Sequence, residues 1–199
     1  MIKPNEERKS TIFRKTGETE ISIQLNLDGP WKAHLATGVP FLDHMLTLFA
    51  VHGSFDLSID AKGDTEVDDH HTVEDIGICL GKAIDQILGE KTGIARYGSC
   101  YLPMDETLVR VVVDVSNRPF LHYNAPVVEQ KIGTYDTALT QEFFRAISQY
   151  CGLTLHIDLL HGENGHHIVE AIFKGFGRAL NTAISRIEID GALSSKGCL

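Results

Sequence analysis

The chain has 199 residues, of which 43% are hydrophobic and 23% are charged, and its formal net charge is −9. This length and apolar content suffice for one sizeable domain with a hydrophobic core, whereas the acidic balance argues against nucleic acid or an anionic membrane as the main partner. No apolar run approaches the roughly 18 residues of a membrane span, and the polar N-terminus lacks the apolar stretch of a secretory signal.

The first half of the sequence predicts strands and helices in alternation. Residues 21–28 and 55–60 alternate apolar and polar side chains, which is typical of half-buried strands. Residues 40–53 carry an apolar stripe at helical spacing, with a proline at the start and a glycine at the end. Residues 70–89 keep the same spacing, and Gly89 is expected to end that helix.

The second half repeats this order of elements. Residues 108–117 and 153–160 read as strands, and residues 137–152 and 166–184 read as helices. We therefore expect an α+β fold, made by tandem duplication of a β-α-β-α unit, in which sheets pack against helices. The whole chain is expected to form one domain (1–199) of two repeats, about 1–95 and 96–192.

The two halves also match residue by residue, with small changes of offset that indicate loop insertions. The equivalent pairs that carry chemistry are His70 with His166, His71 with His167, Glu74 with Glu170, His44 with Glu142, and Glu18 with Glu106. The motif HHxxE thus occurs twice, at equivalent places.

The spacing within HHxxE indicates metal ligation. On a helix, His70 and Glu74 are four residues apart and His71 and Glu74 are three apart, so each histidine can approach the carboxylate. The two histidines point about 100° apart, so the simplest interpretation gives each its own ion. With the duplicate, the chain supplies parts for two metal sites. Ligand type alone does not choose among Zn, Fe, Ni and Mn, and the metalloprotease motif HExxH is absent.

Several segments together resemble imidazoleglycerol-phosphate dehydratase, a family of histidine biosynthesis. They are HHTVEDIGICLGKAI, HGENGHHIVEAIFKGFGRAL, GVPFLDHML, SNRPFL and SSKG, and the resemblance runs from about Arg14 to the end of the chain. It implies four-stranded sheets of the ribosomal protein S5 domain 2-like kind. Some bacterial relatives carry a fused phosphatase domain, for which this chain is too short, so a monofunctional enzyme is expected.

The resemblance implies that the protein removes water from imidazole glycerol phosphate to give imidazole acetol phosphate. It also implies two Mn²⁺ ions per active site, with Fe²⁺ or Zn²⁺ possible, and ligands from neighbouring subunits of a 24-subunit homo-oligomer. Carried over by motif, the metal ligands are His44, His70, His71, Glu74, Glu142, His166, His167 and Glu170. Glu142 is a departure, because the family often has histidine there; His156 is expected to be a structural residue on a strand.

The chemistry needs such parts. Metal binding to a ring nitrogen stabilises a deprotonated imidazole, and an imidazolate held between two ions could expel the hydroxyl group through a diazafulvene-like intermediate. Carboxylates then move the protons; the catalytic candidates are Glu18, which matches the family's proton shuttle, together with Glu74 and Glu170.

The substrate's phosphate group needs cations and hydroxyl donors. By resemblance, the substrate contacts are Glu18, Arg96, Arg118, Lys174, Ser194, Ser195 and Lys196, and His52 is added because it lies on the same helical face as His44. Arginine binds phosphate in a bidentate manner, and serine and lysine add donors.

Two other classes of protein remain open from the residues. A binuclear metallohydrolase would need bridging aspartates and an unhindered metal-bound water, and a metal-storage shell would not need the arginines or the serine–lysine tail. The four cysteines (Cys79, Cys100, Cys151 and Cys198) form no CxxC pair and predict free thiols in a cytoplasmic protein.

Overall fold

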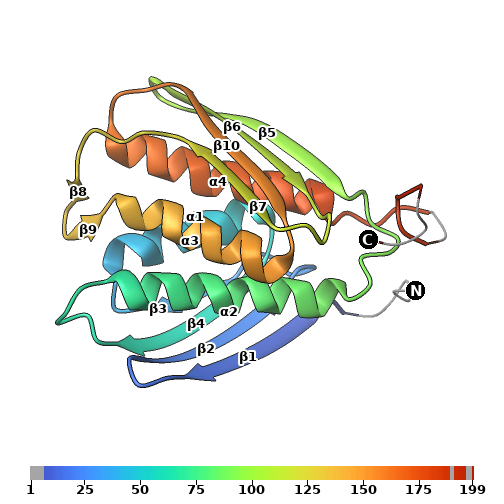
Figure 1. Cartoon of the computed structure of the whole chain (residues 1–199), viewed down its shortest axis with the longest axis horizontal. Coiled ribbons are helices and arrows are strands. Elements are labelled where there is room, and N and C mark those ends of the chain that lie inside the picture. The colour runs from blue at the N-terminus through green and yellow to red at the C-terminus, as the bar shows by residue number, and fades with distance from the viewer. Residues whose placement is uncertain (1–6, 189–190, 196–198) are drawn as a thin grey trace.

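The computed structural model describes residues 7–188, 191–195 and 199. Two four-stranded sheets enclose a layer of helices (Figure 1). The first half contains β1 (Lys9–Lys15), β2 (Thr19–Asn26), β3 (Ala33–Ala36), α1 (Pro40–Gly53), β4 (Asp56–Gly63) and α2 (His70–Leu88). The second contains β5 (Tyr97–Met104), β6 (Thr107–Asp114), β7 (Phe120–Asn124), β8 (Lys131–Ile132), β9 (Tyr135–Asp136), α3 (Ala138–Cys151), β10 (Thr154–His161) and α4 (Gly165–Ala183).

The sheets confirm the predicted α+β class and the duplication. Their strand orders are β1-β2-β4-β3 and β5-β6-β10-β7, which are equivalent in the two halves. In the first sheet Ile23 of β2 pairs with Ile59 of β4, and in the second Val111 of β6 pairs with Ile157 of β10. All four side chains are fully buried, so the period-two pattern of the sequence marks the faces that point toward the helices.

Within the two four-stranded sheets, four strands have no counterpart among the predicted elements: β1, β3, β5 and β7; the short pair β8–β9 has none either. Each lies at an edge of its sheet. The edge strands β3 and β7 contain no fully buried residue, because one side of an edge strand meets no neighbouring strand. An edge strand that buries little carries a weak hydrophobic pattern, and sequence periodicity therefore locates only the central strands.

The helices pack across the two halves. Helix α4 crosses α1, and α2 crosses α3, in both cases at a glycine. A Cβ on Gly177 would lie 2.7 Å from the carbonyl oxygen of Phe49, and a Cβ on Gly81 would lie 3.1 Å from that of Ile147. Gly81 and Gly177 are equivalent in the duplication, so both helix crossings require a glycine at the same position of the repeat.

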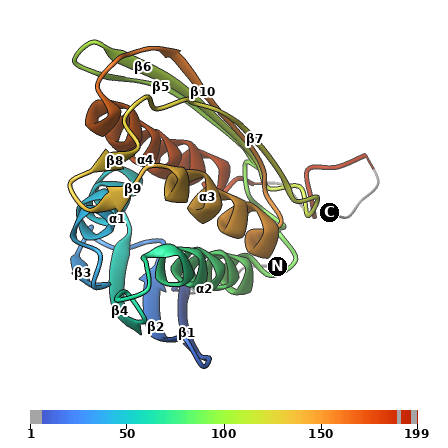
Figure 2. The ribbon, with the colours of Figure 1, turned by 60° about the vertical axis from the view of Figure 1, so that its left-hand side comes forward.

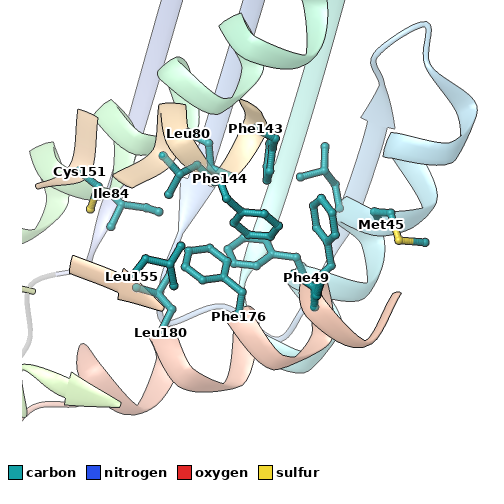
Figure 3. Close-up of a cluster of buried hydrophobic side chains, with 14 of the residues drawn as sticks. Met45, Phe49, Leu80, Ile84, Phe143, Phe144, Cys151, Leu155, Phe176 and Leu180 are labelled. Carbon is teal, nitrogen blue, oxygen red and sulfur yellow. The ribbon is translucent and has the colours of Figure 1, made fainter. Parts of the chain in front are cut away.

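An aromatic cluster joins the helices at the centre of the layer (Figure 3). The ring of Phe176 in α4 stacks on Phe49 of α1, with centroids 5.5 Å apart, and meets Phe144 of α3 edge-on at 5.3 Å. Helices from both halves therefore share one hydrophobic core.

All four helices begin at the same end of the molecule, opposite to the chain termini (Figures 1 and 2). Because the loops that precede α1, α2, α3 and α4 meet there, residues from both halves of the sequence come together at that end. None of the described helices has the length and apolar character that a bilayer span requires.

Candidate metal centre and substrate site

A three-residue cluster lies where α1 meets the start of α4. The Nε2 atoms of His44 and His166 lie 3.4 and 3.1 Å from Oε2 of Glu170. One ligand atom from each residue lies within 4.8 Å of the others. Two imidazoles and one carboxylate that converge in this way form a donor set for a divalent transition-metal ion.

Glu170 stays ionised in this cluster. It is 7% exposed, and burial alone would raise the pKa of its carboxyl group. Lys174, whose Nζ lies 2.5 Å from Oε1 of Glu170, and then His166 outweigh burial and lower that pKa overall. The carboxylate is therefore available as a ligand at neutral pH.

The equivalent residues at the starts of α2 and α3, which are His70, Glu74 and Glu142, lie farther apart. His70 Nε2 and Glu74 Oε2 are 4.0 Å apart. His70 and Glu142 line a common cavity of about 480 Å³ between the starts of α2 and α3. The Glu142 carboxylate is held by an ion pair with Arg145. Among the described residues, the pair His166 and Glu170 forms a close cluster with His44 of α1, whereas His70 and Glu74 form no such cluster with Glu142 of α3.

Neighbouring histidines diverge from each helix, as the helical spacing predicts. His70 and His166 lie 4.0 and 3.1 Å from the carboxylates of their own helices, Glu74 and Glu170, whereas His71 and His167 contact carboxylates outside those helices. Side-chain hydrogen bonds support both starts. The N-cap Asn164 of α4 accepts bonds from the N–H groups of His166 and His167, whereas at α2 the N-cap Asp69 accepts none and Asp68, one residue earlier, accepts a bond from the N–H of His70.

Consequently His71 and His167 contact a different set of carboxylates. Nδ1 of His71 lies 3.0 Å from Asp64, and its Nε2 lies 3.8 Å from Glu18. Nδ1 of His167 lies 2.7 Å from Glu106. Hydrogen bonds to Asp64 and to Glu106 are the main causes that raise the pKa of His71 and of His167, respectively. A metal ion has to displace a proton from each ring, so acidification is expected to weaken metal binding.

We expect Asp64→Asn to lower the pKa of His71 toward the ordinary histidine value. The raised pKa means that the Asp64–His71 pair stabilises the fold below the ordinary value, and that this contribution is lost as pH rises through the raised value. Titration of the His71 ring by NMR in metal-free protein measures the shift, with Asp60→Asn on β4, the strand that ends just before Asp64, as the control. An unchanged His71 titration in Asp64→Asn would contradict the assignment.

Sequence reasoning missed two of these carboxylates as site residues. Asp64 precedes the HHxxE motif by a loop, and nothing in its spacing points to His71. Glu106 had a usable signal, because the duplication pairs it with Glu18. The structure places both members of that pair beside equivalent histidines.

The predicted substrate contacts divide into separate groups. Arg96, Arg118, Ser194 and Ser195 line one cavity of about 1080 Å³. The backbone N–H of Arg96 donates to the carbonyl of Ala183 at the end of α4, and Leu199 also lines the cavity. Helix α4 ends on the side of the molecule that holds the C-terminus (Figure 1), so the cavity lies at that end. Lys196 lies outside the described residues.

His52 and Lys174 lie on the α1–α4 face instead. Burial is the first cause that lowers the pKa of His52, and the positive charge of Lys174 is the second. Lys174 contacts Glu170 of the metal cluster. Within one chain, therefore, neither residue lines the cavity of Arg96 and Arg118.

A buried lysine supports the arginine-lined cavity from beneath. The Lys91 side chain is 0% exposed, and its Nζ lies 2.7 Å from Asp85. It donates to the side-chain oxygen of Asn117 at 2.5 Å and to the carbonyl of Cys151 at 3.0 Å. The ammonium group thus joins the ends of α2 and α3 to the loop that carries Arg118.

We expect Lys91→Met to lower the free energy of unfolding by about 2 kcal/mol, since it leaves the buried carbonyl of Cys151 without its donor and removes the contacts to Asp85 and Asn117, which are partly exposed to water. Urea unfolding of metal-free protein, followed by circular dichroism, measures the loss. Lys62→Met, at an exposed position of β4, is the matched control and should change stability little. A Lys91→Met protein as stable as the control would show that the buried contacts contribute nothing net.

Comparison with known proteins gives a consistent result. A family model described as imidazoleglycerol-phosphate dehydratase matches residues 37–180. Proteins of that name are similar throughout: the one from Desulfotalea psychrophila is 67% identical over 199 residues, 100% of both chains, and the one from Acetivibrio thermocellus is 54% identical, over 97% of this chain and 100% of the relative.

Solved structures agree. The crystal structure of the dehydratase from Staphylococcus aureus has a TM-score of 0.82 and 47% identity, covering 89% of this chain and 99% of that one. The Pyrococcus furiosus structure has a TM-score of 0.79 and 39% identity, covering 94% of this chain and 100% of that one. The chain belongs to the imidazoleglycerol-phosphate dehydratase family.

Proposed function

We propose that the protein converts imidazole glycerol phosphate to imidazole acetol phosphate and water at active sites built from more than one copy of the chain. Family membership makes it a dehydratase of histidine biosynthesis, a carbon–oxygen hydro-lyase. The observation that supports a shared active site is the distance, within one chain, between the metal cluster and the arginine-lined cavity.

That distance exceeds the length of the substrate. His166 lies in the first turn of α4, and Arg96 bonds to Ala183 at the last residue of the helix. At 1.5 Å per residue, these ends of α4 are about 25 Å apart. The substrate, an imidazole ring with a three-carbon phosphate chain, is roughly 10 Å long by covalent dimensions. One molecule that meets both a metal cluster and the arginines must therefore be held by two copies.

The metal clusters support the same proposal. Each of two sets of donors combines residues of both repeats: His44 with His166 and Glu170 in one, and His70 and Glu74 with Glu142 in the other. His71 and His167 contact Glu18 and Glu106 instead. We assign these two histidines as the ligands that complete the clusters of a neighbouring copy, in a homo-oligomer of 24 subunits with octahedral symmetry.

The donor set fits Mn²⁺, and also Fe²⁺ or Zn²⁺, because imidazole and carboxylate ligands suit all three. When bound, two ions per active site would make the substrate's imidazole ring more acidic and leave open positions for its nitrogens. Glu74 and Glu170 would hold the ions, and the ion pair with Lys174 keeps Glu170 charged.

Glu18 is assigned as the proton carrier. Its side chain is 56% exposed and lies 3.8 Å from Nε2 of His71, so it is at the metal-side end and free to move between substrate and solvent. A carboxylate in that place can remove the C–H proton and return a proton to the departing hydroxyl group. Arg118, Ser194 and Ser195 bind the phosphate from the other copy, and Lys196 is expected to join them. The cytoplasm is the proposed location.

The test is conversion of the substrate by Mn-loaded protein of measured metal content and solution mass. Formation of the ketone product is expected, and its absence after removal of the metal by a chelator. If protein with two bound Mn²⁺ per chain produced no ketone, the dehydratase proposal would fail. The same assay separates the alternatives, since a metallohydrolase would release inorganic phosphate or another hydrolysis product and a storage shell would turn over nothing.

A further inference from the structure

The last residue of β6, Asp114, lies between the two arginines of the phosphate cavity. Its Oδ1 is 2.7 Å from Nε of Arg96, and its Oδ2 accepts a second bond from Nη2 of Arg96 at 3.2 Å. The same Oδ2 lies 3.7 Å from Nη2 of Arg118. One carboxylate thus contacts both guanidinium groups.

Arg96 is fixed by this contact and by the C-terminal segment. It is 7% exposed and has a positive φ of 69°. Its Nη1 donates to the carbonyl oxygen of Leu193 at 2.6 Å. The residue therefore ties the segment that carries Ser194 and Ser195 to the sheet, and Asp114 orients the group that does so.

Arg118 differs, because its backbone is fixed while its side chain is exposed. The Ser116 hydroxyl accepts a bond from the N–H of Arg118, and the Thr154 hydroxyl donates to its carbonyl. The side chain is 66% exposed. The ion pair with Asp114 is the contact in the structure that directs this guanidinium toward the cavity.

We propose that Asp114 is a positioning residue for the phosphate site: it holds Arg96 and Arg118 at the orientation in which their remaining N–H groups face the substrate's phosphate. This proposal rests on the proposed function. Asp114 does not touch the substrate, and it acts through the two arginines.

Two physical effects of Asp114 have opposite signs, which makes the proposal testable. By Coulomb's law alone, a carboxylate beside an anion site repels phosphate, so removing its charge should tighten binding. A fixed arginine pair, in contrast, binds phosphate with less loss of side-chain freedom, so releasing the pair should weaken binding. The proposal requires the second effect to dominate.

The experiment compares Asp114→Asn with wild-type, Mn-loaded, fully assembled protein. Binding of inorganic phosphate is measured by calorimetry, and kcat and KM are measured for the substrate. We expect phosphate to bind roughly tenfold more weakly and KM to rise by a similar factor, with a smaller change in kcat. Asp158→Asn is the matched control, since Asp158 pairs with Arg110 on the same sheet at 3.0 Å, and it should leave both constants unchanged.

Tighter or equal phosphate binding by Asp114→Asn would overturn the proposal. If that variant fails to assemble, Asp114→Glu decides: it keeps the charge but displaces the carboxylate, and it should also weaken phosphate binding several-fold, so unchanged affinity would refute positioning. Arg118→Ala separates this proposal from the proposed function. If Arg118→Ala binds phosphate as wild type does, the phosphate site itself is wrong; if it loses binding while Asp114→Asn does not, only the role of Asp114 is wrong.

Discussion

Replacing His166 by alanine is expected to weaken Mn²⁺ binding at its cluster by on the order of a hundredfold or more. The residue supplies one of three converging donors and contacts Glu170 at 3.1 Å. Even outer partners of metal ligands typically contribute 10- to 100-fold to affinity, so the loss of a direct ligand should cost no less. Dehydration should fall by on the order of a thousandfold, because charge stabilisation by a metal contributes several kcal/mol to the transition state.

The measurements are metal content after dialysis and Mn²⁺ titration by electron paramagnetic resonance, alongside the rate of product formation. His156→Ala is the control: His156 lies on β10, at the second sheet, where its ring contacts His122 and Phe120. That variant should keep its metal and its activity. Full Mn²⁺ occupancy in His166→Ala would show that this cluster is not a metal site.

Co-assembly of two inactive variants is expected to restore activity. His166→Ala damages the metal side and Arg118→Ala damages the phosphate side, and the two sides lie at opposite ends of the chain. When active sites draw one side from each of two copies, random mixing of equal amounts leaves up to about a quarter of the sites with both sides intact. Activity should therefore rise from almost none to as much as about a quarter of the wild-type value.

The matched control mixes His166→Ala with Glu170→Gln. These residues lie one helical turn apart on α4 of the same chain, so every cluster in the mixture lacks one donor and no recovery is expected. The chains are co-expressed with different tags, and assemblies that carry both tags are isolated before the assay. If the His166→Ala and Arg118→Ala mixture stays as inactive as the control, the active site is contained within a single chain.

Much of the candidate site follows from local geometry. The divergence of His70 from His71, and of His166 from His167, depends only on 3.6 residues per turn, and in the structure the two members of each pair contact different carboxylates. The central strands can also be located from a short stretch of sequence, since period-two alternation of apolar and polar residues indicates which face of the strand is buried. The duplication is also visible without coordinates, because both copies keep HHxxE.

Other features depend on contacts between distant segments. The edge strands β3 and β7 form by parallel pairing with β4 and β10 and bury few side chains of their own, so their short sequences carry little pattern. Asp64 and Glu106 become partners of His71 and His167 only because the loop between β4 and α2, and the turn between β5 and β6, lie beside the helix N-termini.

By itself, the sequence of this protein determined which residue types are available, how they repeat, and in which directions they leave each helix, because these properties depend on backbone periodicity alone. Only the tertiary structure decided that His44 joins His166 and Glu170 across the two repeats, and that the arginines lie about 25 Å from them, at the other end of α4. Both results come from the crossings of α1 with α4 and of α2 with α3, which require close helix approach at Gly177 and Gly81 and burial of one shared core. Such packing is a property of the folded chain as a whole and is not encoded within any one segment.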